Sequence, residues 1–383
     1  MKFLPLIWRN LLRRKTRTTL TFLSIVVSFL LFGVLMILRV AFTMGVEVAG
    51  ADRLMMTNKM SIIQPIPLAY LPKIQSVPGV NLVSYSSWFG GIYQDPSTNV
   101  FQFAVEPVSY LEMYKEFKLP PDQMKAWLAD RQGCIVGKDL AARFNWKIGD
   151  RIPIKATFNR PKDGSMLWTF NIVGIYDGEQ GVDKTQFLFR HDYLTENRIG
   201  GEGITGWYLI RVSDPPRSAE IAKTIDAMFE NSSTETKTAT EKAMAQSFAN
   251  QVGNIGFMVT SISAVVLFVI LLIAASQMSL AVRERTNEIA AMKAMGFSDP
   301  LILGLVLGES LTIAVAGGAV GIGLAYVISL GGDPSGGLLP IFMFRPTDIA
   351  LGLGLAAVLG LIAGAMPAMA AMRLQIAQAL RRN

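Results

Sequence analysis

The sequence predicts a membrane protein with four transmembrane helices in a 1+3 arrangement and a mixed α/β domain inserted between the first and the second. One long apolar span is followed by a segment of ordinary soluble composition and then by three more apolar spans. The chain of 383 residues is 51% hydrophobic and 17% charged, with a mean hydropathy of +0.37, which is too apolar for a typical soluble protein. Each span matches or exceeds the roughly 20 residues that a helix needs to cross a bilayer. The spans are residues 20–40, 255–282, 301–330 and 349–372.

The basic residues predict the orientation of these spans. The net charge is +7, but the segment 41–254 carries nearly balanced charges, so the basic excess lies beside the spans. Lysines and arginines precede the first span, lie between the second and third, and follow the fourth at 373–383. By the positive-inside rule both termini and the loop 283–299 face the cytosol, whereas 41–254 and the loop 331–348 lie outside. Binding to the bilayer, rather than to nucleic acid, therefore explains the basic pI.

The N-terminal residues 1–19 are expected to form a cytosolic helix in the membrane interface. Their apolar side chains fall on one helical face and most of the basic ones elsewhere. A simple topology anchor is the alternative. A cleaved signal peptide is the alternative for the first span, but the apolar run is too long, lacks a small-x-small exit and is followed by Arg39.

The outside segment reads as a small α/β domain. Short β-branched or aromatic runs bounded by turn residues predict strands at Arg151–Ala156, Trp168–Ile175, Gln186–Phe189 and Gly206–Val212. A helix is predicted over Arg217–Asn231, with an apolar face that covers a sheet. Its apolar residues are Ile221, Ile225, Met228 and Phe229. The Pro-rich stretch Ser61–Pro121 suggests a second lobe.

A stalk helix is predicted next to the second span. Thr238-Ala239-Thr240-Glu241 has the form of a capping box that opens a helix. Met244, Phe248 and Val252 then mark one face that runs into the span at Ile255. We expect a continuous stalk that packs against the first span or a second copy, with an amphipathic collar helix as the alternative.

The loop 283–299 predicts a short cytosolic helix with a defined end. Ile289, Met292 and Met295 form an apolar ridge at a spacing of three. Gly296 followed by Phe297 fits a Schellman end in which Phe297 folds back on Met292. Because such a ridge is unusual in an otherwise charged hairpin, we expect a partner to bury it.

At these residues the chain resembles the MacB/FtsX-like family of ABC transporter permeases. The family loop typically reads Arg-x-Glu-Ile followed by Lys-Ala-x-Gly, and the resemblance covers essentially the whole chain. It includes the basic entry Arg9–Lys15, the segment Gly137–Ala141 with Gly149-Asp150, and the terminal Ala379-Leu380-Arg381. One departure is Ile376, where the family usually has proline, which puts the local turn in doubt.

The resemblance implies a permease subunit, not an enzyme, whose ATP and Mg²⁺ are bound by a separate ATPase. Two copies of the permease, or this chain and a paralogue, would lie in the bacterial cytoplasmic (inner) membrane and bind two cytosolic ATPase subunits. The loop would couple ATP hydrolysis to movement of the outside domain for export or for handling of lipoprotein or efflux cargo. An outside adaptor, lipoprotein or hydrolase is a possible further partner. The coupling residues would be Arg283, Glu284, Arg285, Glu288, Ile289, Met292, Lys293, Met295 and Gly296.

Two other functional classes remain open at this point. An FtsX-like signalling subunit would activate a cell-wall hydrolase without transport. An integral-membrane hydrolase would need a catalytic constellation that the sequence lacks. The segment Gly133–Asp139 is not a P-loop, because three residues instead of four separate its glycines and Asp139 replaces the hydroxyl residue. His191 is the only histidine and Cys134 the only cysteine, which excludes a histidine-rich zinc site and an internal disulfide.

Glu309 is the only acidic residue within the predicted spans. Intramembrane carboxylates usually pair or line a pathway. We expect Glu309 to pair with Arg13, Arg14 or Arg17, with a snorkelling acid as the alternative. Glycines spaced four apart in spans three and four indicate close packing of these two helices. They are Gly304 and Gly308, Gly317 and Gly321, and Gly360 and Gly364.

Overall fold

The computed structural model describes residues 15–48, 50, 52–96, 98, 100–178, 182–251, 255–332, 334, 339 and 342–375. Most of the predicted interfacial helix (1–14), Arg13 and Arg14 within it, and the tail from residue 376 onward lie outside the described residues. The chain divides into two compact units. The helical unit comprises Met1–Val40, Ile255–Gly332 and Phe342–Asn383, and the α/β unit comprises Ala41–Asn254 and Asp333–Ile341.

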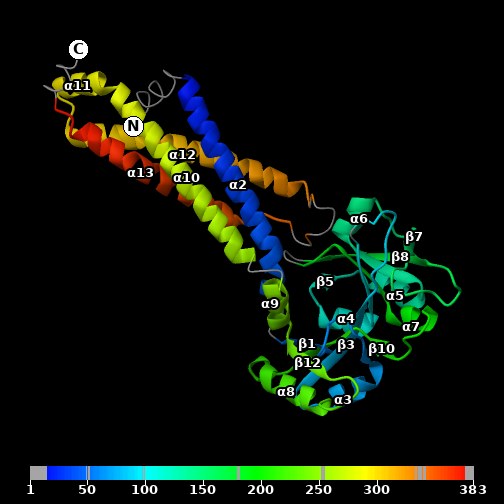
Figure 1. Cartoon of the computed structure of the whole chain (residues 1–383). Coiled ribbons are helices and arrows are strands. Elements are labelled where there is room, and N and C mark those ends of the chain that lie inside the picture. The colour runs from blue at the N-terminus through cyan, green and yellow to red at the C-terminus, as the bar shows by residue number, and fades with distance from the viewer. Residues whose placement is uncertain are drawn as a thin grey trace. The chain divides into compact units, whose positions relative to one another are not determined.

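The described residues contain four helices that are long and apolar enough to cross a membrane. They are α2 (Lys15–Val48), α10 (Ile255–Glu284), α12 (Asp299–Leu330) and α13 (Pro346–Met372), and Figure 1 shows their order along the chain. The chain is a multi-pass membrane protein, and the 1+3 arrangement around an α/β insertion is confirmed. A shorter helix, α11 (Thr286–Ala294), connects α10 to α12.

Glycine contacts bring the long helices together at two interfaces. A Cβ added at Gly321 would lie 2.4 Å from the carbonyl oxygen of Val26 in α2. A Cβ added at Gly360 would lie 2.8 Å from the Cβ of Ala314 in α12. The small residues therefore allow backbone approach, as expected for helices that pack in lipid. Gly317 and Gly321, which were expected to pack against α13, instead contact α2. A Cβ added at Gly304 would have no neighbour within 4 Å.

The α/β unit is built on one mixed sheet. Its strand order is β12-β1-β11-β3-β4-β9-β6-β8-β5, with β7 paired to β8. The pairs β4·β9 and β6·β8 are parallel, and the other pairs are antiparallel. The strands are β1 (Arg53–Asn58), β3 (Val80–Trp88), β4 (Phe101–Val105), β5 (Phe117–Lys118), β6 (Gly133–Gly137), β7 (Arg151–Lys155), β8 (Leu167–Gly178), β9 (Gln186–Arg190), β11 (Trp207–Val212) and β12 (Thr236–Thr240). A separate pair joins β2 (Ile66–Pro67) and β10 (Ile204–Thr205).

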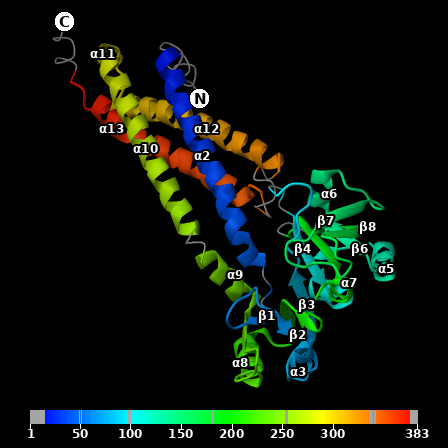
Figure 2. The same ribbon diagram turned by 45° about the vertical axis from the view of Figure 1, so that its right-hand side comes forward.

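Short helices follow or connect these strands in the α/β unit (Figure 2). They are α3 (Leu71–Gln75), α4 (Pro107–Met113), α5 (Pro121–Ala129), α6 (Lys138–Phe144), α7 (His191–Asn197), α8 (Ser218–Met228) and α9 (Glu241–Gln251), with 3₁₀ turns η1 (Leu68–Tyr70) and η2 (Pro215–Arg217). The stretch Ser61–Pro121 does not form a second lobe, because β3 and β4 within it are central strands of the same sheet.

Alternating burial explains why these segments pair. In β7 the residues alternate strictly between exposed and buried, and Ile152 and Ile154 enter the core with Trp168 of β8. Helix α8 covers another part of the sheet with Ile221, Ile225 and Phe229, as its predicted apolar face requires. Met228 of the same predicted face is instead 41% exposed.

The start of α9 differs from the predicted capping box. Strand β12 continues through Thr240, which pairs with Leu54, so the cap moves two residues along the chain. The hydroxyl of Thr240 accepts a hydrogen bond from Ala243 N–H at 3.1 Å. The Thr238 hydroxyl instead donates a hydrogen bond to Asp226 Oδ1, and the Glu241 carboxylate pairs with Arg53. Residues 252–254 lie outside the described residues, and so therefore do Val252 and the continuity of the predicted stalk.

Candidate functional site

The candidate site is the end of the helical unit at which α11 connects α10 to α12. Helix α10 ends at Glu284 and Arg285 precedes the first turn of α11. Gly296 adopts φ +93°, a conformation that glycine permits, and Phe297 N–H donates to Met292 O at 3.1 Å. This is the Schellman bond expected from the sequence. The chain then enters α12, with Pro300 in its first turn.

The apolar ridge of α11 is only partly buried within the chain itself. Ile289 is 4% exposed and packs with Met278, Ile302 and Val306. Met292 is half-buried against the same cluster, whereas Met295 is 71% exposed. The expectation that a partner buries the ridge is therefore wrong for Ile289 and stays a prediction for Met292 and Met295. A spacing of three marks an apolar helix face, but it does not show whether that face packs on the chain or on another protein.

A different face of α11 is open. Asn287, Ala291, Ala294 and Met295 are exposed and recur at i, i+4, i+7 and i+8. This spacing places them on one side of a helix. We call these four residues the exposed stripe of α11. The two alanines were not among the predicted coupling residues, although their small size and helical spacing were visible signals.

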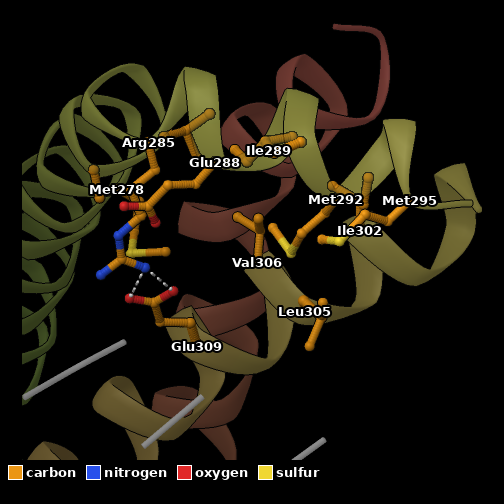
Figure 3. A pocket seen from close by; sticks show the side chains of 13 residues that line it. Met278, Arg285, Glu288, Ile289, Met292, Met295, Ile302, Leu305, Val306 and Glu309 are labelled. Atoms are coloured by element: carbon orange, nitrogen blue, oxygen red, sulfur yellow. Dashed lines mark hydrogen bonds and ion pairs between the residues drawn. The ribbon is translucent and has the colours of Figure 1, made fainter. Parts of the chain in front are cut away.

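Glu309 pairs with Arg285 and not with the N-terminal arginines. Arg285 Nη1 lies 3.1 Å from Glu309 Oε1 and 2.9 Å from Oε2, and Glu309 is 7% exposed (Figure 3). Arg17, one of the expected partners, forms its ion pair with Glu284 at 2.6 Å. The correction has a simple cause: the turn between α10 and α11 places Arg285 beside α12, whereas Arg17 faces the end of α10.

Lys293 attaches the far end of α11 to two other elements. Its Nζ lies 2.7 Å from Asp299 Oδ1 at the start of α12. It also donates to the carbonyl oxygen of Met372, the last residue of α13, at 2.5 Å and to that of Leu374, just after the helix, at 3.0 Å. Carbonyls at a helix end lack intrahelical donors, so a lysine there satisfies otherwise orphaned acceptors.

A cavity of about 330 Å³ lies between α10, α11 and α12. Figure 3 shows the Arg285–Glu309 pair on one side and Met292 and Met295 on another. Thirteen residues line it. They are Met278, Ala281, Val282, Arg285, Glu288, Ile289, Ala291, Met292, Met295, Ile302, Leu305, Val306 and Glu309. Five of the predicted coupling residues therefore meet at this cavity, whereas Arg283 and Glu284 lie earlier in α10 and Lys293 and Gly296 lie outside its lining.

Other candidates in the sequence carry no comparable site. His191 is buried and lies 3.1 Å from both Ser87 Oγ and Thr195 Oγ1, and burial lowers its pKa to about 4. Lys138 pairs with Asp177 at 2.7 Å, and Gly137 packs against the backbone of Lys184, so Gly133–Asp139 offers no phosphate cradle. Among the described residues, no group of His, Cys, Asp and Glu could hold a metal ion. Met244 of the predicted stalk is half-buried, and the surroundings of the Phe248 side chain lie outside the description.

Comparison with known proteins identifies the helical part. Residues 260–376 match the family described as FtsX-like permease C-terminal. An uncharacterised ABC transporter permease of Methanocaldococcus jannaschii is 25% identical over 348 residues, which cover 84% of this chain and 82% of that protein. Residues 260–376 thus form an FtsX-like permease C-terminal domain. In this FtsX-like permease the matched residues include α11, α12, α13 and the Arg285–Glu309 pair.

Two named exporters match parts of the FtsX-like permease. The macrolide export ATP-binding/permease protein MacB of Campylobacter fetus subsp. fetus is 35% identical over 106 residues, or 28% of this chain and 16% of MacB. The pyoverdine export ATP-binding/permease protein PvdT of Pseudomonas fluorescens is 30% identical over 222 residues, or 55% of this chain and 33% of PvdT. The chain thus spans a minor part of either exporter.

Two solved structures resemble the FtsX-like permease at 10% sequence identity. The extracellular domain of the noncanonic ABC-type transporter YknZ from Gram-positive bacteria covers 49% of this chain and is matched over its whole length, with a TM-score of 0.36. The periplasmic region of MacB from Actinobacillus actinomycetemcomitans covers 53% of this chain and is matched over 94% of its own length, with a TM-score of 0.37.

Proposed function

We propose that this permease couples ATP hydrolysis by a separate cytosolic ATPase to movement of its α/β unit, for export or for handling of lipoprotein or efflux cargo. ATP and Mg²⁺ would be bound by the ATPase, with two permease copies, or this chain and a paralogue, in the complex. Both termini and α11 would face the cytosol and the α/β unit would lie outside, in a bacterial cytoplasmic membrane. The relatives named as ATP-binding/permease proteins support this assignment.

The observation that carries the proposal is the way α11 is held. Its first turn is fixed by Arg285 to α12, its inner face by Ile289, and its last turn by Lys293 to the end of α13. A helix attached in this way moves together with α10, α12 and α13. The exposed stripe, formed by two alanines, Asn287 and Met295, is the surface that a partner could contact to move α11.

The exposed stripe can be tested with one matched pair of variants. Met295→Asp places a charge on the surface that the ATPase would cover, and we expect at least a tenfold loss of ATPase binding and ATP turnover because a charged side chain in a docked surface is poorly tolerated. Met60→Asp is the control, since Met60 is 83% exposed in the α/β unit. Neither variant changes a buried core residue, although Met295 also lines the cavity.

The measurement is co-purification of a P-loop ATPase with the permease, identified by its peptides and by ATP turnover in membranes. Full retention of the ATPase and of turnover by Met295→Asp would show that α11 is not the coupling helix. Met292→Asp is less informative, because Met292 is half-buried in the chain's own cluster and the variant would also disturb folding.

An FtsX-like signalling subunit is the alternative, and the outside partner distinguishes the two. An adaptor or a lipoprotein bound to the α/β unit would support transport. A peptidoglycan hydrolase bound there, whose activity follows ATP turnover without movement of cargo, would support signalling.

A further inference from the structure

We propose that Arg53 is a positioning residue that joins both ends of the α/β unit to α4 and the segment after it, so that a displacement of α9 is delivered to residues 107–118. The inference concerns the α/β unit alone and goes beyond the coupling role of α11. It holds whether the permease exports a cargo or signals.

Arg53 and Glu241 lie where the chain enters and leaves the α/β unit. Arg53 begins β1 shortly after α2, and Glu241 begins α9 directly after β12. Strands β1 and β12 are antiparallel neighbours, and the pairing of Leu54 with Thr240 brings the two side chains together. Arg53 Nε lies 2.6 Å from Glu241 Oε2, which also accepts a hydrogen bond from Gly50 N–H at 3.3 Å.

The other arm of Arg53 reaches the segment that follows α4. Its Nη1 lies 2.7 Å from Glu116 Oε1, and its guanidinium lies 4.6 Å from the ring centre of Tyr114. The Tyr114 hydroxyl donates to Glu241 Oε1 at 2.8 Å. The two oxygens of Glu241 are thus shared between Arg53 and Tyr114. Arg53, Glu241 and Tyr114 close a ring of contacts, to which Glu116 is attached through Arg53.

A second arginine holds the same segment from the neighbouring strand. Arg211 of β11 pairs in register with Arg53. Its Nη2 donates to Glu112 O at 2.9 Å and to Met113 O, the last carbonyls of α4. A cation at a helix C-terminus satisfies orphan acceptors and complements the helix dipole. Arginines of two neighbouring strands, β1 and β11, therefore hold the end of α4 and the residues that follow it.

Burial makes the contacts of Arg53 with Glu241 and Glu116 hard to break. Arg53 is only 7% exposed and is shared between two carboxylates, and separating a buried ion from its partners leaves an uncompensated charge. Small displacements of α9 should therefore move the segment after α4 rather than break the contact. That segment continues into β5, where Phe117 pairs with Gly178 of β8 and stacks on Tyr176 with ring centres 4.9 Å apart. The contacts thus lead from the ends of the unit to the opposite end of its sheet.

A coupling cycle on the full-length permease distinguishes transmission from simple stabilisation. Gln246→Gly loosens α9 at an exposed position inside the helix, because glycine is a poor helix former. Amide hydrogen exchange followed by mass spectrometry is read at residues 107–118 in the purified chain without any ATPase. We expect Gln246→Gly to raise the amide exchange rate of residues 107–118 several-fold in the otherwise natural sequence. In a chain that already carries Arg53→Met, Gln246→Gly should leave that rate unchanged.

Two further variants keep the test decisive. If Arg53→Met does not fold, Glu116→Gln can replace it, because it weakens only the Arg53–Glu116 contact. It should likewise abolish the rise in exchange that Gln246→Gly causes. Glu235→Gln is the control, since it removes the exposed Lys59–Glu235 pair and should leave both exchange and the cycle unchanged. An unchanged 107–118 segment in Gln246→Gly, or an equal increment in both backgrounds, would overturn the proposal. Because no ATPase is present, this outcome is independent of whether α11 binds one.

Discussion

Arg285 and Glu309 form a nearly buried ion pair, with Nη1 of the arginine 2.9 Å from Oε2 of the glutamate. The arginine directly precedes α11 and the glutamate lies in α12, so one interaction fixes the orientation of the connecting helix. The pair also provides the charge balance that lets Glu309 reside within a membrane-spanning helix.

Replacing Glu309 should destabilise the permease in proportion to the interaction that Arg285 loses. We expect Glu309→Leu to lower the free energy of unfolding by about 3 kcal/mol, because it removes the carboxylate that pairs with a nearly buried arginine. Glu309→Gln should cost less, about 1 to 2 kcal/mol, because the amide still accepts a hydrogen bond. Thermal unfolding of the chain in detergent measures both. Glu284→Gln is the control, and it should cost less than about 1 kcal/mol. Natural stability of Glu309→Leu would rule out a stabilising pair.

Two glycines of α12 should respond in opposite ways to the same substitution. Gly321→Ala places a methyl group 2.4 Å from the Val26 carbonyl, which forces α2 and α12 apart at a cost of about 1 to 3 kcal/mol. Gly323→Ala meets nothing within 4 Å and should be neutral or stabilising by up to about 1 kcal/mol. The unfolding midpoints of the two variants, two residues apart on one helix, decide the matter. Equal effects would mean that Gly321 is not a contact between helices.

The stability of the α/β unit should fall with acid through His191. Burial lowers its pKa from 6.5 to about 4, so the neutral ring is favoured in the folded state and the unfolded chain binds a proton first. The contribution is complete above pH 6.5 and is lost as the pH falls towards 4, by up to about 3 kcal/mol. Tryptophan fluorescence during denaturant unfolding at several pH values measures the slope. His191→Gln should flatten it, and an unchanged slope in that variant would contradict the assignment.

Cysteine labelling should establish the orientation of the membrane spans. Cys134 cannot serve as the probe, because it is fully buried and burial raises its thiol pKa, which keeps it protonated. In a Cys134→Ala background, Met60→Cys should react with an impermeant reagent in intact cells lacking an outer permeability barrier. Ser298→Cys, next to α11, should react only after lysis. The reverse pattern would invert the proposed topology.

Periodicity along the sequence is enough to predict the spans and four of the strands (β7, β8, β9 and β11), because their burial patterns are local. Ile152 and Ile154 alternate with exposed residues, and Ile221, Ile225 and Phe229 follow one helix face. The Schellman end at Gly296 is equally local, since both bonded residues lie within one turn. Each of these features depends on residues that are near neighbours in the chain.

Contacts between distant residues could not be predicted in the same way. Glu309 had several basic candidates, and only the packing of α11 against α12 selects Arg285 over Arg17. Arg53 and Glu241 are far apart in sequence, and their pairing follows from the adjacency of β1 and β12. Burial of Ile289 likewise depends on Ile302 and Val306, which periodicity within α11 does not reveal.

The adjacency of β1 and β12 also bears on how this architecture can diversify. Paired residues on antiparallel strands lie about 5 Å apart, so the two boundaries of the insertion meet at the same point in the fold. A domain inserted through two closely spaced connections can be lengthened, shortened or exchanged without a change in the separation of the chain ends that flank it. The α/β unit is in this sense an interchangeable cassette, and a graft that retains the Arg53–Glu241 edge is the minimal exchange that preserves both boundaries.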